Sequence, residues 1–163
     1  MFILPLLMVL CFFVLTLFGY IMHYALHQQW MGRFNKSHMT HHMILYPPER
    51  FSSEKYMHAG KDSTIIFFLI AGAPLLFAPL ALFFFGYLSF FSAIILVAEL
   101  GGLGLLNNYL HDSFHIQGHF LNRFEVFRKL VDLHYIHHVD MKKNFGIFTM
   151  MWDKTFKTFS DKQ

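Results

Sequence analysis

Cysteine and charge are both scarce in this 163-residue chain. Cys11 is the single cysteine, so an intramolecular disulfide cannot form and a metal site built from thiolates is excluded. Only 14% of the residues are charged, whereas 55% are hydrophobic and 22 are Phe. This composition is typical of a membrane protein rather than a soluble enzyme.

Charged residues are almost absent from two long stretches. Residues 2–22 carry none, and residues 65–106 carry only Glu99. A helix that crosses a bilayer needs about 20 apolar residues at about 1.5 Å per residue. The first stretch is therefore long enough for one span and the second for a hairpin of two. We predict a single all-α membrane domain over 1–163, with spans at about 2–22, 65–85 and 88–107.

Basic residues are confined to the segments outside these stretches. All 13 Lys and Arg lie within 33–61 or 123–162. Basic loops stay in the cytoplasm, so we expect both segments to form a cytoplasmic helical cap, with the N-terminus on the opposite side of the membrane. The cytoplasmic orientation of the basic segments and the nearby anionic headgroups account for the net charge of +3. Nucleic acid is therefore not expected as a partner.

Ten of the twelve histidines follow a pattern that occurs twice, an HxxxH pair and then an HxxHH triplet. The ten are His23, His27, His38, His41 and His42 in the first copy, and His111, His115, His134, His137 and His138 in the second. Each copy begins where a predicted span ends. Residues three and four apart share one face of a helix, so each pair and each triplet is expected to converge on one centre.

Ten neutral imidazoles are more than one metal ion can use, since zinc usually takes four ligands in all. We therefore predict two metal ions with four or five nitrogens each. Imidazole suits iron, copper, zinc and nickel, so the ligands alone do not identify the metal. A site at the membrane edge has access to acyl chains and to cytoplasmic electrons, which favours redox iron.

The histidine array is followed by Asn144-Phe145-Gly146 and Trp152-Asp153-Lys154-Thr155-Phe156. Over about residues 20–158, this order of motifs resembles the fatty acid hydroxylase and sterol desaturase superfamily of membrane di-iron enzymes. The resemblance implies hydroxylation or desaturation of a membrane lipid with two iron ions and O₂. The HxxxH spacing in both halves looks more like the hydroxylase branch. Carotenoid hydroxylases typically carry HxxxxH instead, which makes a carotenoid substrate a weaker alternative.

An external electron donor is also implied. No Gly-rich dinucleotide motif follows a predicted strand, and no residues remain for a haem domain. We therefore expect a separate reductase, ferredoxin or b-type cytochrome. The oligomeric state is left open.

Several other side chains are candidates for the surroundings of the metals. His119 continues the helical face of His111 and His115 and is a candidate eleventh ligand, whereas His58 belongs to no cluster. Asn107 could hold a water on the metal, and Asn144 and Asp153 lie in the segments that resemble the family. The candidates for orienting the imidazoles with a carboxylate are Asp112, Asp132, Asp140 and Asp153. For each of these residues, an ordinary interfacial or surface side chain is the alternative.

Two other classes of protein could use clustered histidines. A metal transporter or metal-binding protein would need polar groups along its path through the membrane, and the predicted spans contain almost none. A zinc hydrolase would need a general base such as the Glu of HExxH, and the chain has no such motif. Both are disfavoured against a lipid oxygenase.

Overall fold

Three long apolar helices dominate the computed structural model, which describes residues 3–58 and 64–162. They are α1 (Ile3–Leu26), α3 (Thr64–Phe84) and α4 (Phe90–Phe114). All three are long and apolar enough to cross a membrane, which confirms the all-α fold with three spans. α1 and α4 extend beyond the predicted limits and carry His23 and His111 within the helix.

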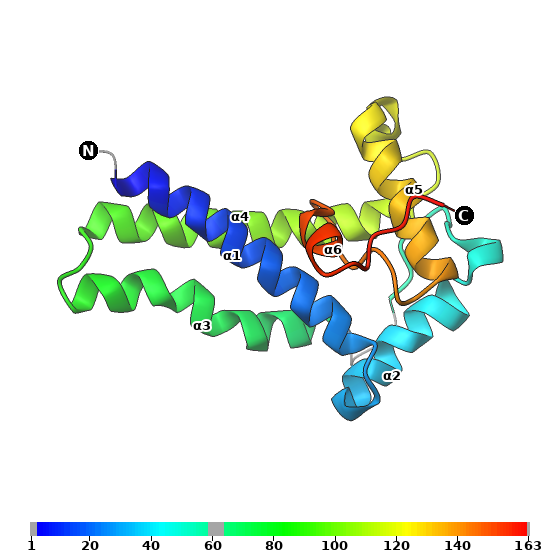
Figure 1. Ribbon diagram of the computed structural model, residues 1–163, viewed down its shortest axis with the longest axis horizontal. Coiled ribbons are helices and arrows are strands. Elements are labelled where there is room, and N and C mark those ends of the chain that lie inside the picture. The colour runs from blue at the N-terminus through cyan, green and yellow to red at the C-terminus, as the bar shows by residue number, and fades with distance from the viewer. Residues whose placement is uncertain (1–2, 59–63, 163) are drawn as a thin grey trace.

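The spans are arranged as a hairpin crossed by a third helix (Figure 1). α3 and α4 run antiparallel, and α1 packs mainly on α4. The start of α1 and the turn between α3 and α4 lie at one end of the molecule. The shorter helices lie toward the other end, with α6 beside α1. Large apolar side chains such as Leu69, Phe77 and Leu105 are exposed on the spans, as expected of surfaces that face lipid.

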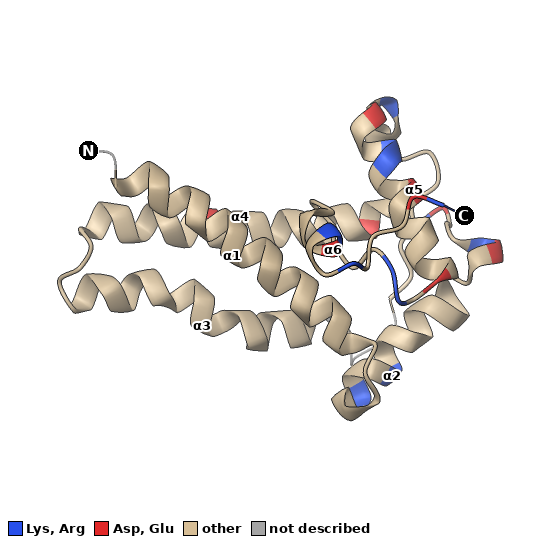
Figure 2. Ribbon diagram, in the orientation of Figure 1, with Lys and Arg blue, Asp and Glu red and all other residues tan. Residues whose placement is uncertain are grey.

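The shorter helices form a cap at the second end. The first half contributes η1 (Gln29–Met31), α2 (Arg33–Thr40), the π-helical turn η2 (His41–Leu45) and η3 (Pro48–Arg50). The second half contributes η4 (Phe120–Arg123), α5 (Glu125–Val139) and α6 (Met151–Thr155). Every Lys and Arg that the structure describes lies in this cap (Figure 2). The described residues form no strand, although a parallel bridge pairs Ser53 with Ile116.

Candidate metal centre

The ten histidines of the two copies meet where the spans end and the cap begins. The ends of α1 and α4 carry the HxxxH pairs, whereas α2 with its π-helical turn and α5 carry the HxxHH triplets. His27 and His111 are half-buried, and the other eight are less than 5% exposed. Burial of so many polar rings is costly unless their nitrogens bind a partner.

Nine of these histidines form two groups, and within each group the ligand nitrogens lie within 4.8 Å of one another. We call the groups site A and site B. Site A consists of His23, His27, His38, His42 and His137, and site B consists of His41, His115, His134 and His138. Four or five imidazoles are enough to hold one transition-metal ion, so the cluster offers ligands for two.

Each HxxHH triplet contributes to both sites. In the first copy, His38 and His42 belong to site A and the middle histidine, His41, to site B. The second copy reverses this, with His134 and His138 in site B and His137 in site A. The expectation that each triplet converges on one centre is therefore wrong. Around a helix, the first and third histidines differ by about 40°, whereas the middle one lies about 100° from the third, so it points to the neighbouring site.

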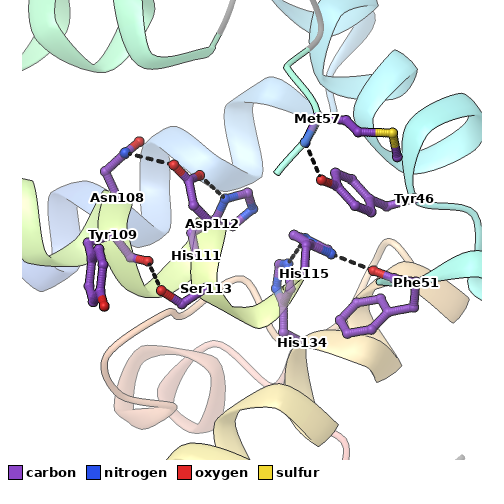
Figure 3. Close-up of polar contacts among 10 residues, drawn as sticks. All are labelled: Tyr46, Phe51, Met57, Asn108, Tyr109, His111, Asp112, Ser113, His115 and His134. Carbon is purple, nitrogen blue, oxygen red and sulfur yellow. Dashed lines mark hydrogen bonds and ion pairs between the residues drawn. The ribbon is translucent and has the colours of Figure 1, made fainter. Parts of the chain in front are cut away.

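His111 is the tenth box histidine and lies beside the two groups. Its ring centroid is 4.9 Å from that of His41 and 4.9 Å from that of His134. Its Nδ1 is 3.5 Å from Oδ1 of Asp112 (Figure 3). His111 therefore adjoins site B, and its role as a ligand stays a prediction.

Ring nitrogens face one another at short range inside each site. Nε2 of His27 lies 3.0 Å from Nε2 of His38 and 3.1 Å from that of His137. In site B, Nε2 of His115 lies 3.1 Å from Nε2 of His134 (Figure 3). Adjacent ligands of an octahedral metal with bonds of about 2.1 Å are about 3.0 Å apart. The spacing and the donor atoms therefore fit a nitrogen-rich transition-metal site.

Backbone carbonyl groups hold the second ring nitrogen of four histidines. The Nδ1–O distances are 2.7 Å for His23 to Phe145, 2.8 Å for His115 to Phe51, 2.6 Å for His137 to Lys143 and 2.7 Å for His138 to Tyr46. A ring that donates from Nδ1 keeps its Nε2 lone pair for a metal. Nε2 of His23 and of His138 is buried and has no protein partner among the described residues, as expected of a ligand atom.

Carboxylates play a smaller part than predicted. Asp112 is the predicted carboxylate that approaches a box histidine, and it also accepts a hydrogen bond from Asn108 at 3.2 Å (Figure 3). Asp132 and Asp140 are exposed, and among the described residues no hydrogen bond joins either to a histidine. For these two acids the prediction is wrong, because both side chains lie at the surface.

Asn144 and Asp153 stabilise the loop that contacts His23. The fully buried carboxylate of Asp153 accepts hydrogen bonds from the backbone N–H groups of Phe145 at 2.8 Å and Gly146 at 2.9 Å. Asn144 has a φ of 53° and donates to the carbonyl of Ser160 at 2.7 Å. These contacts hold the Phe145 carbonyl against the His23 ring. Both residues act through this loop, so Asp153 does not orient an imidazole directly, as was predicted for its carboxylate.

Burial keeps the imidazoles of the cap neutral. Loss of hydration lowers the pKa of His27 to about 4 and that of His138 to about 3. The same cause, together with repulsion between neighbouring rings, lowers the pKa well below its ordinary value for His38, His41, His42, His115, His134 and His137. A neutral imidazole has a lone pair available, so these rings can bind a metal at neutral pH without first losing a proton.

His119 is not brought to either site. α4 ends at Phe114, so the helical face on which His119 was expected does not continue. Its Nδ1 instead accepts a hydrogen bond from the N–H of Leu121, and its Nε2 lies 3.2 Å from the hydroxyl of Tyr109. His58 lies outside both sites, in line with the sequence.

Tyr46 is a residue of the centre that the sequence did not single out for this role. The Tyr46 ring is fully buried and stacks on the ring of His115 with centroids 4.2 Å apart. Its carbonyl accepts from His138. The carbonyl acceptors carried no sequence signal, because every residue has the same backbone group.

An apolar cavity of about 420 Å³ lies between the three spans and reaches the histidines. His23, His38 and His111 line one end, and Asn107 lines the wall one helical turn below His111. The remaining walls are almost entirely hydrocarbon. The volume falls in the range of about 300–1,000 Å³ that is typical of sites for small organic ligands. The cavity would bring such a ligand to the edge of the metal centre.

Comparison with known proteins agrees with the motifs. A family model described as Fatty acid hydroxylase matches residues 8–158. This range contains all ten box histidines and the two segments 144–146 and 152–156. No curated protein and no solved structure gives a significant match.

Proposed function

Because the chain belongs to the fatty acid hydroxylase family, we propose that it is a membrane oxygenase that binds two iron ions at sites A and B and hydroxylates a lipid with O₂. The observation that carries the proposal is the position of the histidines. Buried neutral imidazoles in two metal-sized groups lie at the end of an apolar cavity between membrane-spanning helices. This arrangement suits an oxidation in which the reacting group is a hydrocarbon.

When bound, the iron pair would supply the activation of O₂ that cleavage of an unactivated C–H bond requires. The residues of the chain do the remaining work. The histidines bind the ions, and the carbonyl groups of Tyr46, Phe51 and Phe145 orient three of the rings. The buried surroundings exclude water, which prevents side reactions. The cavity holds the lipid so that one carbon lies beside the centre.

Electrons would come from a separate protein, a b-type cytochrome, a ferredoxin or a reductase, as expected from the sequence. The cap carries every described Lys and Arg, so we propose that it faces the cytoplasm, where such a donor could reach it. Insertion of one oxygen atom is favoured over desaturation by the family and by the HxxxH spacing.

The experiment is lipid analysis of cells that express the chain under ¹⁸O₂, with a His42→Ala variant as the inactive control. Wild type should yield a lipid species that gains one labelled hydroxyl group and is absent from the control. An unlabelled product with a new double bond would move the enzyme to the desaturases. Identical lipid profiles in the two strains would contradict the proposal.

A further inference from the structure

The cavity between the spans is closed at its far end. Its deepest lining residues are Leu76 on α3 and Leu100 on α4. One and two turns deeper on α4, Leu96 is 2% exposed and Ala93 is fully buried, so the spans pack tightly beyond this point. His111 is eleven positions after Leu100, which corresponds to a depth of roughly 16 Å at about 1.5 Å per residue. The cavity is therefore a chamber that extends from the histidines part of the way into the membrane. It is closed at this floor and open at the side, where its lining residues Leu69 and Leu105 are exposed.

Polarity differs between the two ends of this chamber. The histidines and the amides of Asn107 and Asn108 lie toward the cap, whereas the floor consists of Leu side chains. A polar group at the floor would lose its hydrogen bonds to water without replacement, at a cost of several kcal/mol on hydrocarbon scales. An amphiphilic lipid therefore enters with its polar end on the histidine side and its hydrocarbon chain toward the floor.

Glycines widen the wall of the chamber on α4. Gly104 and Gly101 line the cavity about 10 Å and 15 Å below the level of His111. Glycine in a helix interior costs about 1 kcal/mol relative to alanine, so each needs a reason. Close packing of helices is a common reason in membranes, and it accounts for Gly101, where a Cβ would stand 3.7 Å from Cδ1 of Leu76. No heavy atom lies within 4 Å of the point where a Cβ of Gly104 would stand. A side chain at Gly104 would project into the chamber instead.

We propose that this chamber measures the hydrocarbon chain of the substrate, and that Gly104 determines the chain length that it admits. The substrate class is an amphiphile with one unbranched chain whose end reaches the floor at Leu76 and Leu100. The inference rests on the proposed function for the identity of the site, and it adds the residue that sets specificity.

α4 offers a matched control. Gly102 lies on the same helix and also has no atom within 4 Å of its Cβ position, but it is exposed on the outer surface and does not line the cavity. Gly104→Leu and Gly102→Leu therefore add the same side chain to the same helix, one inside the chamber and one outside. Iron content and thermal stability of both purified proteins would establish that both variants fold.

The test uses unbranched fatty acids of graded length that carry a photoreactive diazirine at the tail, bound to the iron-loaded protein in lipid nanodiscs. In wild type and in Gly102→Leu, the longer probes should label Leu76 and Leu100. In Gly104→Leu, labelling at this floor should fall by at least about tenfold, since each displaced methylene is worth about a factor of four in binding.

Three outcomes would contradict the proposal that the chamber measures the hydrocarbon chain. They are undiminished floor labelling in Gly104→Leu, an equal loss in Gly102→Leu, and no labelling of the chamber in wild type. Failure of the proposed function looks different. In that case the photoreactive probes still label Leu76 and Leu100 in the wild-type protein, but cells that express it under ¹⁸O₂ form no labelled lipid.

Discussion

The middle histidine of each HxxHH triplet joins the two halves of the chain. His137 comes from the second copy, yet its Nε2 lies 3.1 Å from that of His27 in the first. His41 comes from the first copy, and its ring centroid lies 4.7 Å from that of His115 in the second. Each site therefore takes one histidine from the other half of the chain. The full ligand set of each site forms only when both copies fold against each other.

This exchange gives a prediction for single histidines. His137→Ala should weaken metal binding at site A, by more than the roughly 10- to 100-fold that changes to the partners of metal ligands alone cause. The metal binding of His137→Ala should therefore resemble that of His38→Ala, which changes site A. It should differ from that of His134→Ala, which changes site B. Metal titration of the three variants followed by Mössbauer spectroscopy would check this. His58→Ala is the control, and a His137→Ala protein that resembles His134→Ala would refute the exchange.

The segment after α5 shows how a short element can position a ligand. Phe145 presents its carbonyl to His23, and the next residue, Gly146, lies against the chain with no space for a side chain. A Cβ there would stand 2.8 Å from Oδ2 of Asp153 and closer still to the carbonyl oxygen of Thr149. Only glycine allows the Asp153 carboxylate to accept both backbone hydrogen bonds of this turn.

We expect Gly146→Ala to destabilise the protein by about 1–3 kcal/mol or more, because the added carbon meets backbone that cannot move away. The melting temperature in detergent should fall, and iron content should fall with it, since His23 loses its carbonyl partner. Gly102→Ala, at an exposed position with open space, should be neutral or stabilising. Equal melting temperatures for Gly146→Ala and wild type would contradict this account of the segment.

Helix-scale features were predictable to different degrees. Runs without charge located the three spans, because burial in lipid excludes charge over a whole helix. The repeated HxxxH and HxxHH spacing located the box histidines, because residues three and four apart lie on one face of a helix. The end of α4 before His119 and the assignment of each triplet to two sites depend on how the halves pack together. Local spacing contains no information on that packing.

At the scale of the whole molecule, one end of the spans carries the cap and the other carries only the hairpin turn and the start of α1 (Figure 1). If basic segments stay in the cytoplasm, the cap faces the cytoplasm and the turn at Tyr87 faces the other side. The cap is then within reach of a soluble or anchored electron donor, and the chamber opens toward the same side of the bilayer.

Cysteine labelling tests this orientation. In a Cys11→Ser background, cysteines introduced at Ser53 and Lys162 should react with an impermeant reagent only from the cytoplasm, and one at Tyr87 only from outside. Tyr87 is 77% exposed, so access to it is not limited by the protein. Reaction of Ser53 and Lys162 from opposite sides would exclude the arrangement of three spans with a single-sided cap.

The central claim is that two separate histidine groups each hold one iron ion, and Fe(II) titration of the metal-free protein tests it most directly. The account predicts that wild type binds about two equivalents, as the donor set of sites A and B requires. The double variant His38→Ala/His42→Ala, which leaves three histidines in site A, and His134→Ala, which leaves three in site B, should each bind about one. Binding of a single equivalent by wild type, or full binding by both variants, would contradict the account.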